Sequence, residues 1–253
     1  MLNNLEEYDK MTSTESELWW YKILHEQVLN ALRATNKSKD SAILDAACGT
    51  GGLMKRLIEQ GFSNIQGFDV SPYAVSIAQE KTSKEIKLVD LKKAHTIYVE
   101  NSFDVIVCND ALYFIEESQL PTVLAQLWSL LKEDGVLIIN LPAFNFFKGM
   151  HDVTVDIHER WTYTKFRKVV KGSSLEKLRT QHTYWPFFLS PLILVARLFQ
   201  KVQLKLNPDR RVVSDVQLPP LVLNKIFYNL TKWESYLPFS RWVGSSLFIV
   251  IRR

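Results

Sequence analysis

Short apolar runs alternate with helical patterns through the first half of the chain. Four of the runs end in polar residues, over 42–45, 64–69, 86–90 and 103–110. Between them, apolar residues recur at helical spacing, and Ser-Pro or glycine marks where helices begin or end. Parallel strands covered on both faces read as continuous apolar runs. The pattern therefore predicts parallel strands joined by helices.

The remaining elements extend this arrangement at both ends. Helices are predicted from 17 to 34, 118 to 131, 163 to 170, 190 to 206 and 221 to 237, and further strands over 136–141, 175–184 and 245–251. Residues 1–17 are polar and expected to be loose. Strands alternating with helices give a mostly parallel sheet, and the last strand is expected to be antiparallel. We expect an α/β fold, a Rossmann-like, doubly wound, seven-stranded, mostly parallel sheet with helical lid additions.

We divide the chain into three parts on this basis. Residues 1–40 form an N-terminal helical segment, 41–142 a nucleoside-binding core, and 143–253 the lid and substrate-binding insertions together with the last strands of the same sheet. At 253 residues the chain suits one large domain with additions.

The candidate chemistry begins at the turn after the first strand. The stretch 42–52 reads Ala-Ile-Leu-Asp-Ala-Ala-Cys-Gly-Thr-Gly-Gly. A glycine turn between a strand and a helix places backbone N–H groups at the crevice above the sheet, where nucleotides bind in open α/β folds. Asp69 ends the second strand, 18 residues past Gly51, and an acid there can accept both ribose hydroxyls of a nucleoside. Asp90 and Asn109-Asp110 end the next two strands. The spacing therefore predicts a nucleoside with a ribose.

These residues resemble the motifs of the class I S-adenosylmethionine-dependent methyltransferases. The first motif is similar to residues 45–51, the second to 67–71, the fourth to 103–112, and the following helix-turn-strand to 130–139. Ala47 stands where the family has its first glycine. More weakly, His151-Asp152, His158, Arg160-Trp161-Thr162 and the ending Pro238-Phe239…Ser245-Ser246-Leu247 resemble type 11/12 bacterial small-molecule methyltransferases.

The resemblance implies S-adenosylmethionine as the cofactor and assigns roles to matching positions. Asp45, Gly49 and Gly51 would serve its methionine end, helped by Asn109, while Asp69 would bind the ribose. Val70, Asp90 and Leu91 would lie at the adenine. The turn residue Ala47 is also a cofactor candidate. In the resembling family the N-terminal helix lies across the cofactor, which makes Tyr21, with Trp20 and His25, a candidate for contact with cofactor or substrate. The alternative, which we favour, is that these aromatic residues pack the helix on the sheet edge.

The densest group of unusual polar residues falls in the predicted lid. His151 and His158 are candidate general bases, since neutral imidazole accepts a proton near pH 7, and Asp152 would orient either one. Structural hydrogen bonding of the lid and a metal site are the alternatives. Arg160, Trp161 and Phe144 are candidate substrate contacts, and an ordinary surface ion pair is the equal alternative for Arg160.

Charge and composition bear on partners. Residues 1–142 carry 13 Lys and Arg against 20 Asp and Glu, whereas 143–253 carry 18 against 7, so the basic balance belongs to the lid half. An anionic acceptor or a membrane surface would be attracted there. The apolar stretch 185–199 is too interrupted to span a bilayer, but it suits a lipid-like or aromatic acceptor.

The expected partner is a small molecule, without nucleic acid, because no RNA-binding module is recognisable. Two cysteines and an N-terminus unlike a signal peptide favour a cytoplasmic protein. We expect methyl transfer to a small molecule, with oxygen favoured as the acceptor atom. A SAM-binding protein without catalysis and a NAD-type oxidoreductase on a similar fold are the alternatives.

Overall fold

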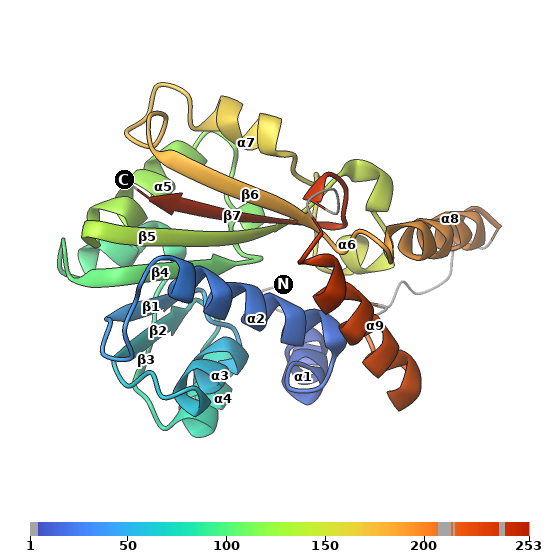
Figure 1. Cartoon of the computed structure of the whole chain (residues 1–253), viewed down its shortest axis with the longest axis horizontal. Helices are drawn as coiled ribbons and strands as arrows, with labels where there is room; N and C mark the ends of the chain where they lie inside the picture. Colours follow the sequence, from blue (N-terminus) through green and yellow to red (C-terminus); the bar gives the residue numbers. More distant parts are fainter. Residues whose placement is uncertain (1–4, 207–213, 215, 238–240, 253) are drawn as a thin grey trace.

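A seven-stranded sheet organises the chain in the computed structural model, which describes residues 5–206, 214, 216–237 and 241–252 (Figure 1). The spatial order of the strands is β3-β2-β1-β4-β5-β7-β6. Their bounds are β1 Ile43–Ala46, β2 Ile65–Asp69, β3 Ile86–Leu88, β4 Phe103–Asn109, β5 Leu131–Pro142, β6 Arg179–Trp185 and β7 Ser246–Arg252. Strands β1 to β5 pair in parallel, and β7 runs antiparallel between β5 and β6. The predicted fold class is confirmed.

Alternate residues of the central strands point to two separate layers of helices. On β1, Leu44 belongs to the core beneath α5 (Leu120–Ser129) and α7 (Tyr163–Val169), whereas Ile43 faces α2 (Trp19–Ala34) and α3 (Gly52–Glu59). The same alternation holds along β4. Both faces are therefore covered, which explains why these strands read as continuous apolar runs.

The helix boundaries follow local signals where those signals exist. α4 (Pro72–Thr82) begins as predicted, with the Ser71 Oγ accepting from the Ala74 N–H at 3.3 Å. The start of α7 is likewise capped by Thr162, whose Oγ1 accepts from the Lys165 N–H. α2 begins without a cap from a neighbouring side chain. The side chain of Asn224, on α9 (Leu221–Glu234), instead accepts from the Trp19 N–H at 2.9 Å.

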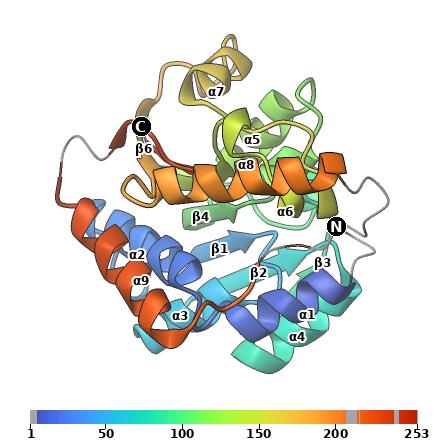
Figure 2. The same ribbon diagram turned by 90° about the vertical axis from the view of Figure 1, so that its right-hand side faces the viewer.

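The expectation that residues 1–17 are loose is wrong for the described part of that segment. Residues 5–14 form helix α1 (Leu5–Thr14), which packs beside α4 (Figure 2). Its Tyr8 ring meets the Tyr73 ring edge-on, with centroids 6.4 Å apart. Tyr8 and the carboxylate-bearing Glu7 are both buried. This polar helix is thus held by tertiary contacts rather than by an apolar stripe.

The lid segments follow β5 and lie at one end of the sheet. They comprise the 3-10 turn η3 (Asn145–Phe147), α6 (Met150–Thr154), α8 (Ser190–Leu206) and α9. α8 and α9 project from the same end of the molecule (Figures 1 and 2). Of the helices in the described ranges, none combines the length and the apolar character that crossing a membrane requires. The Pro238-Phe239 part of the predicted ending lies outside the described residues.

Candidate active site

A cavity of about 610 Å³ lies at the carboxyl ends of the central parallel strands. Its floor comes from the residues that follow β1, β2 and β4, and its walls come from α1, α2 and the lid. This is the crevice in which open α/β sheets bind ligands. The cavity is the candidate active site.

The turn that follows β1 forms one end of the cavity. Ala47 has a φ of +61° in the left-handed region that favours glycine, as the family pattern implies for this position. Gly49 lines the cavity, but Gly51 does not. A Cβ at Gly51 would lie 3.0 Å from the Ala78 Cβ on α4. Gly51 therefore lets α4 approach the turn closely, and its predicted cofactor contact is not supported by its place.

Asp69 holds this turn in shape. Its Oδ2 accepts from the Gly49 N–H at 2.8 Å and its Oδ1 accepts from the Ser71 N–H at 2.9 Å. The side chain is buried and lines the cavity, and burial raises the pKa of the carboxyl despite these hydrogen bonds. Each carboxylate oxygen accepts more than one hydrogen bond, so Asp69 retains capacity for a ribose hydroxyl.

Two buried oxygen atoms in the cavity wall are able to accept hydrogen bonds from a ligand. The Asp45 Oδ2 and the Asn109 Oδ1 have no hydrogen-bond partner within the described residues, and both residues line the cavity. Burial first, and then the nearby charges of Asp69 and Glu15, raise the pKa of Asp45 to about 8. Buried polar atoms without partners are rare in folded proteins. A ligand ammonium would satisfy both acceptors, so these residues fit the methionine end of S-adenosylmethionine.

The other residues assigned to the cofactor surround the same cavity. Ala47, Val70, Asp90, Leu91 and Tyr21 all line it. One Asp90 oxygen accepts from the Lys92 N–H at 2.9 Å, which caps the short helix η1 (Leu91–Thr96) and fixes the loop. The structure thus brings these five positions together, and their individual roles stay predictions.

Helix α1 and the residue that follows it cover the glycine turn, a contact that the sequence did not predict. The position of a Cβ on Gly49 lies 3.0 Å from the Met11 Sδ, and the Glu15 carboxylate sits over Gly52 at the start of α3. Lys81 forms an ion pair with Glu15 and donates to the Thr12 Oγ1 at 2.9 Å. The N-terminal segment is thereby locked over the cofactor end of the cavity.

The cavity is also lined, next to Asn109, by a carboxylate that the sequence pointed to without assigning. Asp110 follows β4, lines the cavity and has a φ of +50°. The Asn140 Nδ2 donates to both of its oxygens, at 2.9 and 3.1 Å, and the Trp185 Nε1 donates to the Asn140 Oδ1 at 3.2 Å. Burial raises the pKa of Asp110 to about 7. Groups poised near neutral pH suit proton transfer.

Aromatic residues line the cavity near Asp110. Tyr21 and Tyr113 line it, and burial raises the pKa of both phenols well above the usual value. His25 also lines it, 6.4 Å from Tyr21 between ring centroids, and burial lowers the pKa of His25 to about 3. The Trp20 ring stacks on Trp185 at 5.4 Å. The walls here are neutral near pH 7 and largely apolar.

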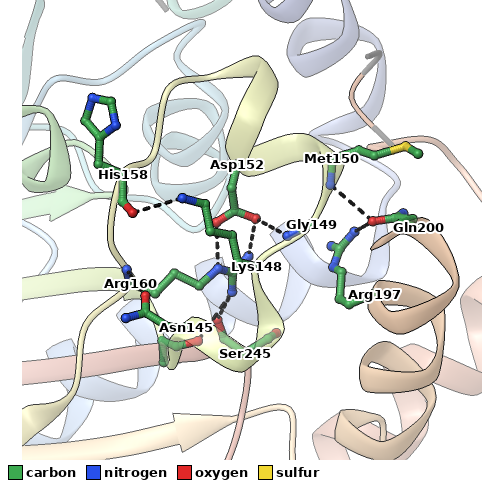
Figure 3. A network of polar contacts seen from close by, with 11 residues as sticks. Asn145, Lys148, Gly149, Met150, Asp152, His158, Arg160, Arg197, Gln200 and Ser245 are labelled. Carbon is green, nitrogen blue, oxygen red and sulfur yellow. Dashed lines mark hydrogen bonds and ion pairs between the residues drawn. The ribbon is translucent and has the colours of Figure 1, made fainter. Parts of the chain in front are cut away.

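The two lid histidines occupy different places. His151 lines the cavity, with its Nδ1 2.9 Å from the Ser214 Oγ and 3.8 Å from a Glu7 oxygen. His158 does not line it, its side chain is 87% exposed, and its ring points away from the lid's interior (Figure 3). His151 keeps the place of a candidate base, while the position of His158 does not support one.

Arg160 and Asp152 form a buried ion pair that anchors the lid (Figure 3). The Arg160 Nε and NH2 donate to the two Asp152 oxygens at 2.6 and 2.9 Å, and NH1 donates to the Ser245 carbonyl at 3.0 Å. Burial alone would raise the pKa of Asp152, but the hydrogen bond and charge of Arg160 lower it. Asp152 therefore orients Arg160 rather than a histidine. Arg160 borders the cavity, but its guanidinium is paired with Asp152, and this ion pair is buried rather than at the surface as the alternative had it.

Two predicted substrate contacts lie outside the cavity lining. The Trp161 N–H donates to the Pro142 carbonyl and the Phe144 N–H donates to the Trp161 carbonyl, so the two segments form a short bridge after β5. Trp161 is buried in the core, and Phe144 packs on Tyr184 with ring centroids 4.6 Å apart. Both side chains stabilise the base of the lid, which explains why they do not reach the cavity.

Groups of three His, Cys, Asp or Glu side chains arranged to hold a metal ion are absent from the described ranges. The metal alternative for His151, His158 and Asp152 is not supported by their positions, because Asp152 pairs with Arg160 and His158 faces solvent.

Comparisons with known proteins agree with this geometry. Residues 43–135 match the model of the methyltransferase domain family. A protein of Geobacillus sp. (strain WCH70) named as a methyltransferase is 31% identical over 140 residues, covering 50% of this chain and 56% of that protein. The ubiquinone biosynthesis O-methyltransferase of Glaesserella parasuis is 28% identical, covering 54% and 62%. The glycine/sarcosine N-methyltransferase of Aphanothece halophytica is 32% identical, covering 43% and 45%. The chain thus spans about half the length of these relatives.

Solved structures extend the likeness of the fold over the whole chain. A Haloferax volcanii complex of the Trm112 methyltransferase activator with a methyltransferase matches with a TM-score of 0.61 and 15% identity, covering 98% of this chain and 95% of that one. An S-adenosylmethionine-dependent methyltransferase of Archaeoglobus fulgidus matches with a TM-score of 0.55 and 14% identity, covering 90% and 94%. The comparisons agree with the methyltransferase resemblance that the motifs indicate, over residues 43–135 for the family model and in the fold for the solved structures.

Proposed function

We propose that this chain, a class I S-adenosylmethionine-dependent methyltransferase, transfers the methyl group of its cofactor to an oxygen atom of a small-molecule acceptor. The division of labour follows the sequence-based one, with residues 41–142 holding the cofactor and 143–253 covering the acceptor. The N-terminal segment 1–40 would cover the cavity with two helices. α1 lies over the glycine turn, and α2 contributes Tyr21 to the cavity lining. The cavity of about 610 Å³ supports a small acceptor.

The observation that carries the oxygen proposal is the place of Asp110. Its carboxyl group lines the cavity, its pKa is raised by burial to about 7, and Asn140 orients it. A hydroxyl loses its proton as it becomes a methyl ether, and a base with a pKa near the working pH removes that proton most effectively. Asp110 would accept this proton, and His151 is the second candidate in the same cavity.

The chain's remaining residues would position the two reactants. S-adenosylmethionine supplies an already activated methyl group when it is bound. Asp45 and Asn109 would hold its ammonium, Asp69 its ribose, and Val70 would pack on its adenine. The aromatic wall around Tyr21 would exclude water from the acceptor. Transfer then depends mainly on alignment of the acceptor oxygen with the methyl group.

The relatives do not choose between oxygen and nitrogen, because their names include an O-methyltransferase and an N-methyltransferase. The dependence of rate on pH separates the two chemistries. For an oxygen acceptor with Asp110 as base, kcat should rise as pH increases through about 7, because the carboxylate must be ionised. For an amine acceptor the rise should instead track the pKa of the amine and persist in Asp110→Asn.

The direct experiment measures formation of S-adenosylhomocysteine from S-adenosylmethionine with a low-molecular-mass fraction of a bacterial cell extract. Asp110→Asn should lose about 10²–10⁴-fold in kcat while binding the cofactor normally. Asp156→Asn is the matched control, since it makes the same change at a carboxylate that is exposed on the lid. Full turnover by Asp110→Asn would refute the assignment of the base. Binding of the cofactor without turnover with any fraction would favour the alternative, a SAM-binding protein without catalysis.

A further inference from the structure

The outer face of α8 is apolar and exposed along its whole length. Ser190 is its one buried residue, within the part of the chain that the structure describes. Leu192, Val195, Phe199, Val202 and Leu206 recur at helical spacing on this face, and each is more than half exposed. Soluble monomers rarely expose an apolar stripe of this extent without an interaction that covers it.

α9 and the residues that follow it add a second apolar surface at the same end of the molecule (Figures 1 and 2). Leu221, Val222 and Ile226 are exposed on α9, as is Trp233 near its end. Trp242, in the segment before β7, is 74% exposed. Exposed tryptophans beside exposed aliphatic side chains are typical of surfaces that lie at a membrane–water boundary.

Positively charged residues outnumber acids in the segments that form this end. Residues 186–253 contain ten lysines and arginines against three acids, which leaves a formal charge of +7. One of the three acids, Glu234, belongs to the described residues. Its carboxylate is buried and accepts hydrogen bonds from the Phe187 and Phe188 N–H groups. Lys201 and Lys205 lie exposed on α8 among its apolar residues. The charged partner that this surface complements is therefore anionic.

We infer that the α8–α9 face, defined by the exposed apolar and basic residues above, docks onto an anionic lipid surface. An amphipathic helix with basic residues binds in the plane of such a surface through apolar burial and charge attraction together. A second copy of the chain fits less well, because a two-fold interface would bring two surfaces of the same positive charge together.

The inner face of α8 connects the docking surface to the candidate active site. Ile193 and Arg197 line the cavity, and the Gln200 Oε1 accepts from the Met150 N–H of α6 at 3.1 Å (Figure 3). One helix thus covers the acceptor end on one side and faces the lipid on the other. The inference goes beyond the proposed methyl transfer and does not rest on it, because lipid binding is measured without turnover.

The test is co-sedimentation of the full chain with vesicles of phosphatidylcholine alone and of phosphatidylcholine with phosphatidylglycerol in a two-to-one ratio. The protein should sediment with the anionic vesicles, and high salt should release most of it. Each lysine near an anionic surface contributes about fivefold in affinity, so Lys201→Glu/Lys205→Glu should bind at least about 25-fold more weakly. The double reversal Lys168→Glu/Lys171→Glu, made elsewhere in the lid half, should bind normally.

A matched pair of valines tests the apolar part. Val195→Asp, on α8, should lose at least about tenfold in vesicle affinity, whereas Val99→Asp, on an exposed loop outside the α8–α9 face, should not. Both variants should keep the thermal shift with S-adenosylmethionine, which shows that they fold. Failure of the wild type to bind anionic vesicles would overturn the inference. Self-association in sedimentation that Val195→Asp abolishes, without vesicle binding, would assign the face to a second copy instead.

Discussion

Replacing Asp45 with asparagine should change stability and cofactor affinity in opposite directions. The carboxyl is buried, and its pKa is raised from 3.8 to about 8, so the folded chain holds a proton that the unfolded chain releases between these values. Stability from this group is complete below pH 3.8 and is lost as pH rises toward 8.

The magnitude follows from the pKa values. One pKa unit corresponds to about 1.4 kcal/mol, and about three units lie between 3.8 and pH 7, so the native residue costs on the order of 4 kcal/mol there. Asparagine avoids this cost, but a buried amide without a full set of hydrogen-bond partners itself destabilises the folded chain by about 1–3 kcal/mol. Asp45→Asn should therefore be more stable than wild type by about 2 kcal/mol at pH 7, which is roughly 4–8 °C in Tm.

The same change should weaken the cofactor. A hydrogen bond to a charged group contributes about 1.5–3 kcal/mol, so the Kd for S-adenosylmethionine should rise by roughly 10- to 150-fold. A ligand at 100 times its Kd stabilises by about 2.7 kcal/mol, and in the variant the same concentration should give about 0.3–1.4 kcal/mol.

Thermal unfolding at pH 5 and 7, with and without S-adenosylmethionine, measures both effects. The stability gain of Asp45→Asn should shrink at pH 5, because the unfolded wild-type chain holds more of the proton there and the wild type therefore loses less stability. Loss of stability in ligand-free Asp45→Asn at pH 7, or an unchanged ligand-induced shift, would refute the reasoning.

Four other variants test neighbouring parts of the site. Asp69→Ala should weaken S-adenosylmethionine by about 1.5–3 kcal/mol in calorimetric titration, and unchanged affinity would contradict the ribose assignment. Arg160→Ala should lower the free energy of unfolding in urea by about 3–5 kcal/mol, because it leaves the Asp152 charge buried and unpaired; a loss below 1 kcal/mol would mean that the pair is dispensable. His151→Ala should reduce turnover if this histidine assists Asp110, whereas His158→Ala should retain full turnover because its ring is exposed. Equal and full turnover in both would make the lid histidines structural.

The strands and the cofactor end were predictable because their signals are local. An apolar run, an acid and a glycine turn occupy adjacent positions around Asp45, and parallel pairing brings Asp69 and Asn109 to the same edge of the sheet. Helix α1 was not predictable in this way. Its polar sequence buries Glu7, and the residue that follows it, Glu15, is buried against Lys81, a pairing that joins residues far apart in the chain.

The acceptor end was only partly predictable for a related reason. The sequence placed Asp110 at a strand end, but its raised pKa arises from burial in the folded chain, which outweighs the lowering effect of the hydrogen bond from Asn140, on another strand. Asp152 and Arg160 looked like catalytic or binding residues because of their types, yet eight residues apart in the lid they neutralise each other. The folded geometry was needed to separate His151, in the cavity, from His158, at the surface.

The most direct test of the central claim is a thermal-shift measurement on the wild-type protein with S-adenosylmethionine, S-adenosylhomocysteine and NAD in parallel. Saturating adenosyl ligand at about 100 times its Kd should add about 2.7 kcal/mol, or roughly 5–10 °C in Tm, and NAD should add nothing. A shift with both adenosyl ligands alone would agree with the cofactor site built around Asp45, Asp69 and Asn109. A shift with NAD alone would contradict methyl transfer and leave only the fold standing.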